Sequence, residues 1–160
     1  MNASEELVGL WLQVVKGYFI RNGVLPRKSR KEMDFLAIKP RENKYIWVEV
    51  SVPINPVGWV QWRDYKKMFP PDLEIAARQI LGAAPEKWFV YGVVKGDGAD
   101  RLLKMRKMGI KTVSFYKTVL PSLLTHLRKW SPDTARQFVL LYKVHRRIEK
   151  ESEKRKSKEQ

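Results

Sequence analysis

The chain of 160 residues contains no cysteine, which excludes disulfide bonds, thiolate catalysis and cysteine-based zinc sites. It has two histidines, His126 and His145. Neither has a partner at the spacing of a metal ligand, so a histidine-built metal site is not predicted. No run of about 18 apolar residues is present, so the sequence predicts no membrane-spanning helix. Any chemistry must therefore come from carboxylates, lysines, arginines and hydroxyl groups.

Positive charge dominates what is present. Lysine and arginine number 32 against 17 acidic residues, a formal net charge of +15, while 44% hydrophobic residues suffice for a core. Such an excess indicates a polyanionic partner, most often nucleic acid. Residues 1–7 carry Glu5 and Glu6 and no basic segment, so we expect a cytoplasmic protein without a secretory signal. Abundant Lys, Arg and Glu with few Asn and Gln is typical of a thermophile's intracellular protein.

The apolar spacing predicts an α/β domain over residues 1–130, followed by a C-terminal helix and basic tail over 131–160. The expected elements, in chain order, are a helix (5–22), three strands (24–28, 33–38 and 45–52), two helices (58–68 and 72–83), a strand (88–94), a helix (99–108), a strand (111–116) and two helices (121–130 and 132 onward). The apolar run of 88–94 is typical of a strand buried on both faces of a parallel sheet.

Two acids fall within or beside the expected strands. Alternation along residues 45–52 puts Glu49 on the face of Trp47 and opposite that of Val48. An acid in an apolar strand is costly unless it is paired or binds a cation. Asp34 opens the preceding strand, so Asp34 and Glu49 are predicted to meet across a hairpin. Converging carboxylates suit Mg²⁺, which prefers oxygen ligands and can activate water against a phosphodiester.

This pattern resembles the restriction-endonuclease-like nucleases, often called the PD-(D/E)XK superfamily, and is most similar to their small archaeal resolvase-type members. The resemblance spans roughly residues 4–117 and is carried by Glu5-Glu6, by 31–34 and by 49–51. It implies a mixed central sheet flanked by helices, endonuclease activity, and Mg²⁺ or Mn²⁺ as cofactor. In the family an Asp and a Glu on successive strands hold the metal, and these match Asp34 and Glu49. Glu5 or Glu6 matches an additional helical ligand of some members.

Ser51 departs from the family pattern. Two residues after the strand Glu, the family has a catalytic lysine that supports the attacking water. A hydroxyl cannot supply that positive charge. Some members place the lysine elsewhere, and the candidates here are Lys28, Lys31 and Lys66. The sequence thus leaves open a metal-dependent endonuclease with a degenerate site and, as the alternative, a catalytically inactive DNA- or RNA-binding module of the same fold, including a ribosome-associated one. An adaptor that binds an acidic protein is a more distant hypothesis.

Each acid also has a structural explanation. Asp34 can cap the turn before its strand. Glu49 can form an ion pair with Arg27, Lys28 or Arg63. Glu5 and Glu6 stand in a first helical turn, where acids stabilise the helix dipole. The sequence does not choose between these explanations and a metal site.

Two segments are candidate nucleic-acid surfaces, and each also has a purely structural explanation. Four cations precede Asp34 and can contact phosphates or simply face water: Arg27, Lys28, Arg30 and Lys31. A second segment mixes cations with tryptophans that can stack on bases or fill the core: Trp59, Trp62, Arg63, Lys66 and Lys67. No motif for sequence-specific readout is present. The partner is therefore DNA or structured RNA, and a homodimer is implied only by the resolvase resemblance.

Overall fold

The computed structural model describes residues 3–26, 31–52, 68–94 and 98–130, with Trp130 described by its backbone alone. The elements are α1 (Ala3–Leu10), the π-helical turn η1 (Trp11–Val15), β1 (Phe19–Val24), β2 (Met33–Lys39), the 3-10 turn η2 (Pro40–Glu42), β3 (Lys44–Ser51), α2 (Pro71–Leu81), β4 (Glu86–Tyr91), α3 (Gly98–Lys107), β5 (Lys111–Ser114), the π-helical turn η4 (Phe115–Val119) and α4 (Leu120–Trp130).

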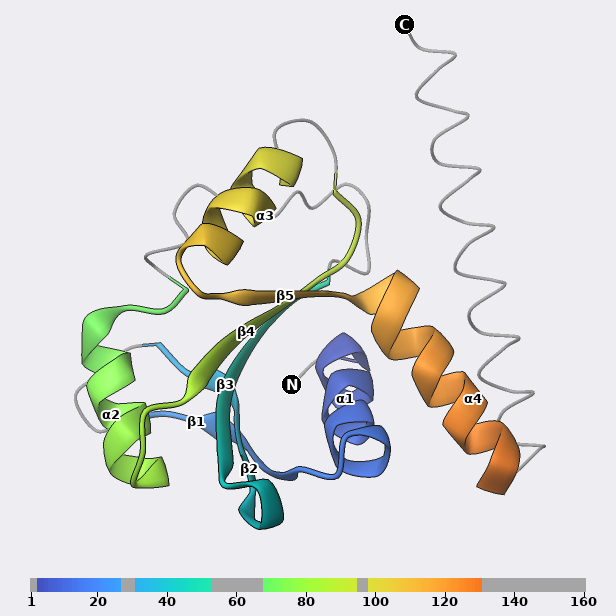
Figure 1. Cartoon of the computed structure of the whole chain (residues 1–160), viewed down its shortest axis with the longest axis horizontal. Helices are drawn as coiled ribbons and strands as arrows, with labels where there is room; N and C mark the ends of the chain where they lie inside the picture. Colours follow the sequence, from blue (N-terminus) through green and yellow to red (C-terminus); the bar gives the residue numbers. More distant parts are fainter. Residues whose placement is uncertain (1–2, 27–30, 53–67, 95–97, 131–160) are drawn as a thin grey trace, which may run out of the picture.

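The described strands form one mixed sheet in the order β1-β2-β3-β4-β5. The first three pair antiparallel as a meander, whereas β3, β4 and β5 pair parallel. Helices connect the parallel strands because a parallel pair needs a crossover. Figure 1 shows α1 and α4 on one face of the sheet and α2 and α3 on the other. The expectation of an α/β fold with a mixed sheet flanked by helices is therefore confirmed.

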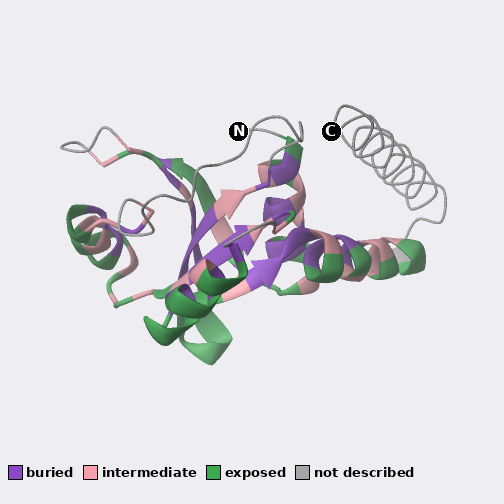
Figure 2. Cartoon of the chain, turned by 90° about the horizontal axis from the view of Figure 1, so that it is seen from above, coloured by how far each residue is buried: buried purple, intermediate pink, exposed green. Residues whose placement is uncertain are grey.

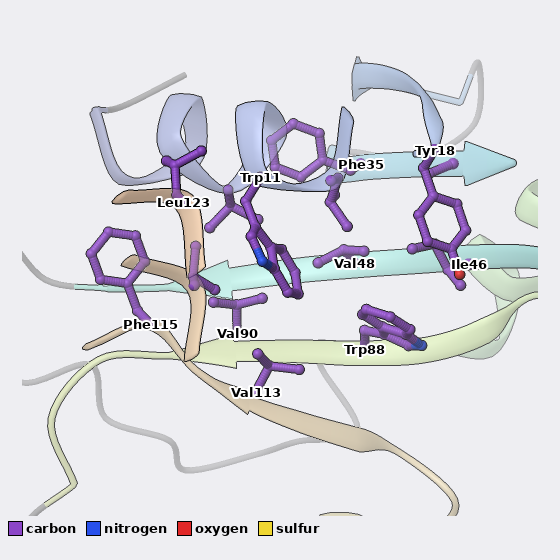
Figure 3. Close-up of a cluster of buried hydrophobic side chains, with 14 of the residues drawn as sticks. Trp11, Tyr18, Phe35, Ile46, Val48, Trp88, Val90, Val113, Phe115 and Leu123 are labelled. Carbon is purple, nitrogen blue, oxygen red and sulfur yellow. The ribbon is translucent and has the colours of Figure 1, made fainter. Parts of the chain in front are cut away.

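Two apolar clusters hold the layers together, one on each face of the sheet. Figure 2 shows the buried stretches of the strands and helices in purple. The first packs α1 and α4 against β2, β3 and β4, and Figure 3 shows Trp11 and Leu123 lying over Val48, Val90 and neighbouring side chains. The second cluster packs α2 and α3 against the opposite face, with Trp47 and Phe89 at its centre. Large aromatic side chains in both clusters bury much apolar area, the main stabilising contribution for a domain of this size.

The strand alternation predicted from the sequence is confirmed in β3 and β4. Ile46 and Val48 belong to the cluster under α1, whereas Trp47 belongs to the cluster under α2 and α3. In β4, Trp88 packs on the first side and Phe89 on the second, so this central strand is buried on both faces. The odd-numbered residues of β3 therefore point toward α2 and α3, and Glu49 is one of them.

The expected helix over 5–22 is wrong in its second half, and the expected strand over 24–28 is misplaced. The helix ends in η1, Gly17 adopts φ +70°, and the chain enters β1 at Phe19. Tyr18 is buried and Phe19 is exposed. Phe19, which fits the helical period of the preceding apolar residues, is instead the first residue of β1. Sheet pairing outweighed the helical spacing here, because β1 gains a full ladder with β2. β1 ends at Val24, the residue at which the predicted strand would begin.

The remaining helices and strands lie within a few residues of their expected ranges. Glycines with positive φ follow α2 at Gly82 and α3 at Gly109. Asp72 stands in the first turn of α2, whereas the N-cap position is Pro70 and not Asp72. The expected helix over 58–68 lies almost wholly outside the described residues, and that from 132 onward lies outside them. Among the described helices, none is long and apolar enough to cross a lipid bilayer.

Candidate functional site

Asp34 and Glu49 lie on neighbouring strands at the end of the sheet where β3 finishes. The antiparallel register pairs Phe35 with Val48, so continuing the two strands by one residue brings Asp34 level with Glu49. The hairpin therefore places the two carboxylates as the strand pattern predicted. The charge of Asp34 acts on Glu49 strongly enough to raise the pKa of Glu49.

Asp34 ends the pairing of β2 with β3. Its Oδ2 accepts a hydrogen bond of 2.6 Å from the backbone N–H of Val50. The ladder between the strands stops at Phe35 and Val48, and the carboxylate takes the next donor of β3 in place of a backbone carbonyl. A charge-assisted bond of this kind fixes the side chain beside Glu49. Asp34 thus has a structural partner, across the sheet instead of in the turn before its strand.

Glu49 is held from two sides and is 6% exposed. The indole Nε1 of Trp47 donates to its Oε1 at 2.7 Å, and the ammonium Nζ of Lys31 lies 2.9 Å from its Oε2. Lys31 also donates to the backbone carbonyl of Met68, which immediately precedes Phe69 and α2. The lysine therefore joins the site to the chain that leads into α2. Of the three lysines considered from the sequence, Lys31 is the one that the described residues bring to Glu49.

Burial raises the pKa of both carboxylates. The pKa of Asp34 rises to about 6, chiefly through desolvation, opposed by the Val50 hydrogen bond and assisted by the nearby charge of Glu5. The pKa of Glu49 rises to about 7, through desolvation first and the charge of Asp34 second, against the opposing effect of Lys31. Desolvation has the larger effect on the pKa of Glu49. The hydration energy that the buried carboxylate loses exceeds the attraction that the partly exposed Lys31 ammonium supplies. Burial, more than any neighbouring charge, therefore holds both pKa values above their ordinary range.

Ser51 follows two residues after Glu49 on the same face. Its carbonyl accepts from the N–H of Gly92, and its register partner is Tyr91 on β4. The Oγ is buried and has no hydrogen-bond partner among the described residues. A buried hydroxyl without a partner costs about 1–3 kcal/mol. The hydroxyl of Ser51 therefore carries no charge and has no described contact that explains it.

The two N-terminal acids differ in their relation to the site. The hydroxyl of Ser4 donates to the carbonyl of Val52 at 3.3 Å, which holds the start of α1 against the end of β3. Glu5 consequently lies near enough to Asp34 for its charge to raise the pKa of Asp34. Glu6 is exposed. Within residues 3–26, 31–52, 68–94 and 98–130, no group of three or more acids or histidines lies close enough together to hold a metal ion.

Most of the candidate nucleic-acid residues are not described. Lys31, from the basic segment before Asp34, belongs to the site. The other candidate residues of both segments lie outside the described residues: Arg27, Lys28, Arg30, Trp59, Trp62, Arg63, Lys66 and Lys67. The same holds for Arg27, Lys28 and Arg63 as proposed ion-pair partners of Glu49. The sequence analysis missed Trp47 as a partner of Glu49, although its position two residues away on the same face of the strand was a usable signal.

Comparison with known proteins adds one structural likeness. No family model and no curated protein matches the chain. A similar solved structure is the crystal structure of AF1548, a protein of unknown function, with 15% sequence identity and a TM-score of 0.49. The alignment covers 78% of this chain and 66% of that protein, so this chain spans slightly less than two thirds of the length of AF1548.

Proposed function

We propose that the chain is a nucleic-acid-binding protein with a restriction-endonuclease-like fold, whose Asp34–Glu49–Lys31 cluster hydrolyses phosphodiester bonds with the help of a divalent metal. The carrying observation is the ammonium of Lys31, 2.9 Å from Glu49 Oε2 and beside a second carboxylate. The family pattern needs two strand carboxylates and one lysine. This chain brings the lysine from the residues before β2, while Ser51 occupies the usual position.

The carboxylates suit a hard cation. Asp34 and Glu49 offer oxygen ligands, and burial, followed for Glu49 by the charge of Asp34, raises their pKa values, so a bound cation would stabilise their charged forms. Mg²⁺ commonly binds proteins through one or two carboxylates and completes its shell with water and substrate phosphate oxygens. Two carboxylates therefore fit Mg²⁺ or Mn²⁺ without a third protein ligand. When bound, the metal would lower the pKa of a water molecule and neutralise charge on the phosphate.

The chain's own groups have distinct tasks in this proposal. Lys31 donates hydrogen bonds to an anionic oxygen of the phosphate or to the attacking hydroxide, because it has three donors and a full positive charge. Glu49 and Asp34 would hold the metal through their carboxylate oxygens and so place its bound water beside the phosphate. Trp47 holds the Glu49 carboxylate in orientation through its 2.7 Å hydrogen bond. The net charge of +15 favours a polyanionic substrate.

Cleavage of labelled duplex DNA, single-stranded DNA and structured RNA, with Mg²⁺ and with Mn²⁺, tests the proposal. We expect metal-dependent hydrolysis that Glu49→Gln and Lys31→Met each abolish. The matched control is Glu86→Gln, because the Glu86 carboxylate also accepts from a tryptophan two residues along its strand, at 3.1 Å from Trp88 Nε1. Glu86 lies at the opposite end of the sheet and should leave cleavage unchanged. No cleavage of any substrate with either metal would refute the proposal.

A binding module without catalysis is the second candidate function. The observation that favours it is the ion pair itself, since Lys31 already neutralises part of the charge on Glu49 without a metal. In that case Lys31 and Glu49 connect the end of β3 to the entry of α2 and act only in stability. Binding of nucleic acid without cleavage, together with an unchanged melting temperature on addition of Mn²⁺, would favour this function over the first.

A further inference from the structure

The described residues from Arg101 onward, around β5, carry positive charge and no acid. None of residues 101–130 is an aspartate or glutamate. We call five exposed cations of this stretch the basic edge: Lys104, Arg106, Lys107, Lys111 and Lys117. They come from the last turns of α3, the start of β5 and the turn η4. The only acid of these three elements is Asp100, in the first turn of α3 and before the stretch that carries the basic edge.

The fold keeps these cations together along one edge of the sheet. β5 pairs with β4 and ends the strand order, while α3 packs beside it on one face and η4 continues from its end (Figure 1). Arg106 Nε donates to Thr112 Oγ1 at 2.7 Å, which fastens α3 to β5. Lys111 Nζ lies 3.9 Å from the centre of the Trp88 ring. The basic edge is therefore carried by regular elements fastened to one another.

Several cations elsewhere in the described residues have acidic partners, whereas no ion pair joins a described acid to the basic edge. At the β2–β3 hairpin, Lys39 and Lys44 both pair with Glu42. Beside α2, Glu74 pairs with Arg78 and Lys87. No described carboxylate lies within ion-pair distance of a basic-edge cation. Their mutual repulsion is therefore not relieved from inside the described molecule, and an external anion would relieve it.

We propose that the basic edge binds the phosphate backbone of a nucleic acid and holds it along β5. The inference deepens the proposed function, on which its choice of nucleic acid rests, by naming the surface that positions the substrate. β5 is two strands away from β3, which carries Glu49, and three from β2, which carries Asp34, about 10 Å and about 14 Å across the sheet. One nucleic acid molecule can therefore span the basic edge and the Asp34–Glu49 pair. Contacts to phosphates fix orientation and carry no sequence information, consistent with a surface made of lysine and arginine.

The dependence of binding on salt tests this surface directly. Binding of the full chain to labelled duplex DNA is measured in EDTA at several salt concentrations, before and after the combined change Lys104→Gln, Lys107→Gln and Lys117→Gln. Each lost phosphate contact should lower the slope of log K against log[salt] by about 0.9. We expect a slope reduced by about 2 to 3 and an affinity reduced at least about tenfold at low salt.

A matched triple substitution elsewhere distinguishes binding by the basic edge from binding by overall net charge. Lys16→Gln, Arg21→Gln and Arg41→Gln remove the same charge from exposed positions around β1 and the β2–β3 hairpin, and should change the slope little. Melting curves of both triple variants check that the fold is kept. Equal losses in the two variants would overturn the inference, because overall charge would then account for binding.

Two further results bear on the partner and on the enzyme. Leu103 and Met108 are exposed beside the basic edge, so vesicles of equal parts phosphatidylcholine and phosphatidylserine form a second arm. Binding to vesicles that depends on the basic edge, with DNA binding unaffected by it, would overturn the choice of nucleic acid. Because EDTA removes metal, loss of slope supports the basic edge even where cleavage fails, and the two proposals fail separately.

Discussion

Replacing Glu49 with glutamine should stabilise the metal-free protein at alkaline pH. Glutamine keeps the shape of the side chain and removes the charge whose burial raises the pKa of Glu49 to about 7 from an ordinary 4.5. Each unit of pKa shift is worth about 1.4 kcal/mol. A shift of about 2.5 units therefore corresponds to about 3 kcal/mol that the charged carboxylate costs the folded state above pH 7.

The sign follows from proton binding. Between about pH 4.5 and pH 7 the folded chain holds a proton on Glu49 that the unfolded chain has released, so the free energy of unfolding falls as pH rises through this window. Below the window Glu49 is protonated in both states, and the stabilising contribution is fully present. Asp34, with a pKa of about 6, acts in the same direction over a lower range. Glu49→Gln removes only the contribution of Glu49.

Urea unfolding at about pH 4 and about pH 8, in EDTA, measures the effect. From about pH 4 to about pH 8 the unaltered protein should lose about 3 kcal/mol of unfolding free energy through Glu49. Glu49→Gln should not lose this contribution, so the variant gains about 3 kcal/mol relative to the unaltered protein. Glu86→Gln, an exposed carboxylate with the same tryptophan contact, serves as the control and should show little change. A variant that is a few kcal/mol less stable at about pH 8 would refute the reasoning, because the ion pair with Lys31 would then outweigh desolvation.

Three further substitutions test other contacts of the site. Ser51→Ala should leave stability unchanged or raise it by about 1 kcal/mol in urea unfolding, because it removes a buried hydroxyl without a described partner; a loss would reveal a partner for that hydroxyl. Gly23→Ala should cost about 1 kcal/mol or more, since Gly23 has φ +60° and an added Cβ would lie 2.5 Å from Glu32 Oε1; an unchanged melting temperature would contradict this. Trp47→Phe removes the indole donor to Glu49 and should raise the pKa of Glu49 further. Titration followed by carbon NMR of the carboxyl group would detect the rise, and an unchanged pKa would show that this hydrogen bond is unimportant.

Local patterns were enough to predict most of the fold. Alternation in 45–52 predicted which residues of β3 face α2 and α3, because the side-chain period of a strand is fixed by its backbone. The boundary between α1 and β1 could not be predicted in the same way. Leu7, Leu10 and Trp11 continue at helical spacing into Tyr18 and Phe19, and only pairing with β2, a distant contact, decides for a strand.

The candidate site was predictable in its carboxylates and not in its lysine. Asp34 and Glu49 meet because two strands of a hairpin have one register, and a hairpin is read from nearby residues. Lys31 approaches Glu49 and the carbonyl of Met68 together. That position depends on where the chain enters α2, which no local period specifies. Spacing therefore left three lysines open; tertiary contacts bring Lys31 to Glu49, while Lys28 and Lys66 lie outside the described residues.

The antiparallel meander that carries both acids has a consequence for the order of folding. β2 and β3 are joined by the turn Pro40–Glu42 and Asn43, so their contacts close short loops, on the time scale of about 1–10 μs. The parallel partner β4 begins at Glu86, and pairing it with β3 closes a much longer loop, which is slower. We therefore expect Asp34 and Glu49 to meet before α2 and α3 exclude water from them. Their desolvation falls late on the pathway, and we expect Glu49→Gln to slow unfolding far more than it speeds folding.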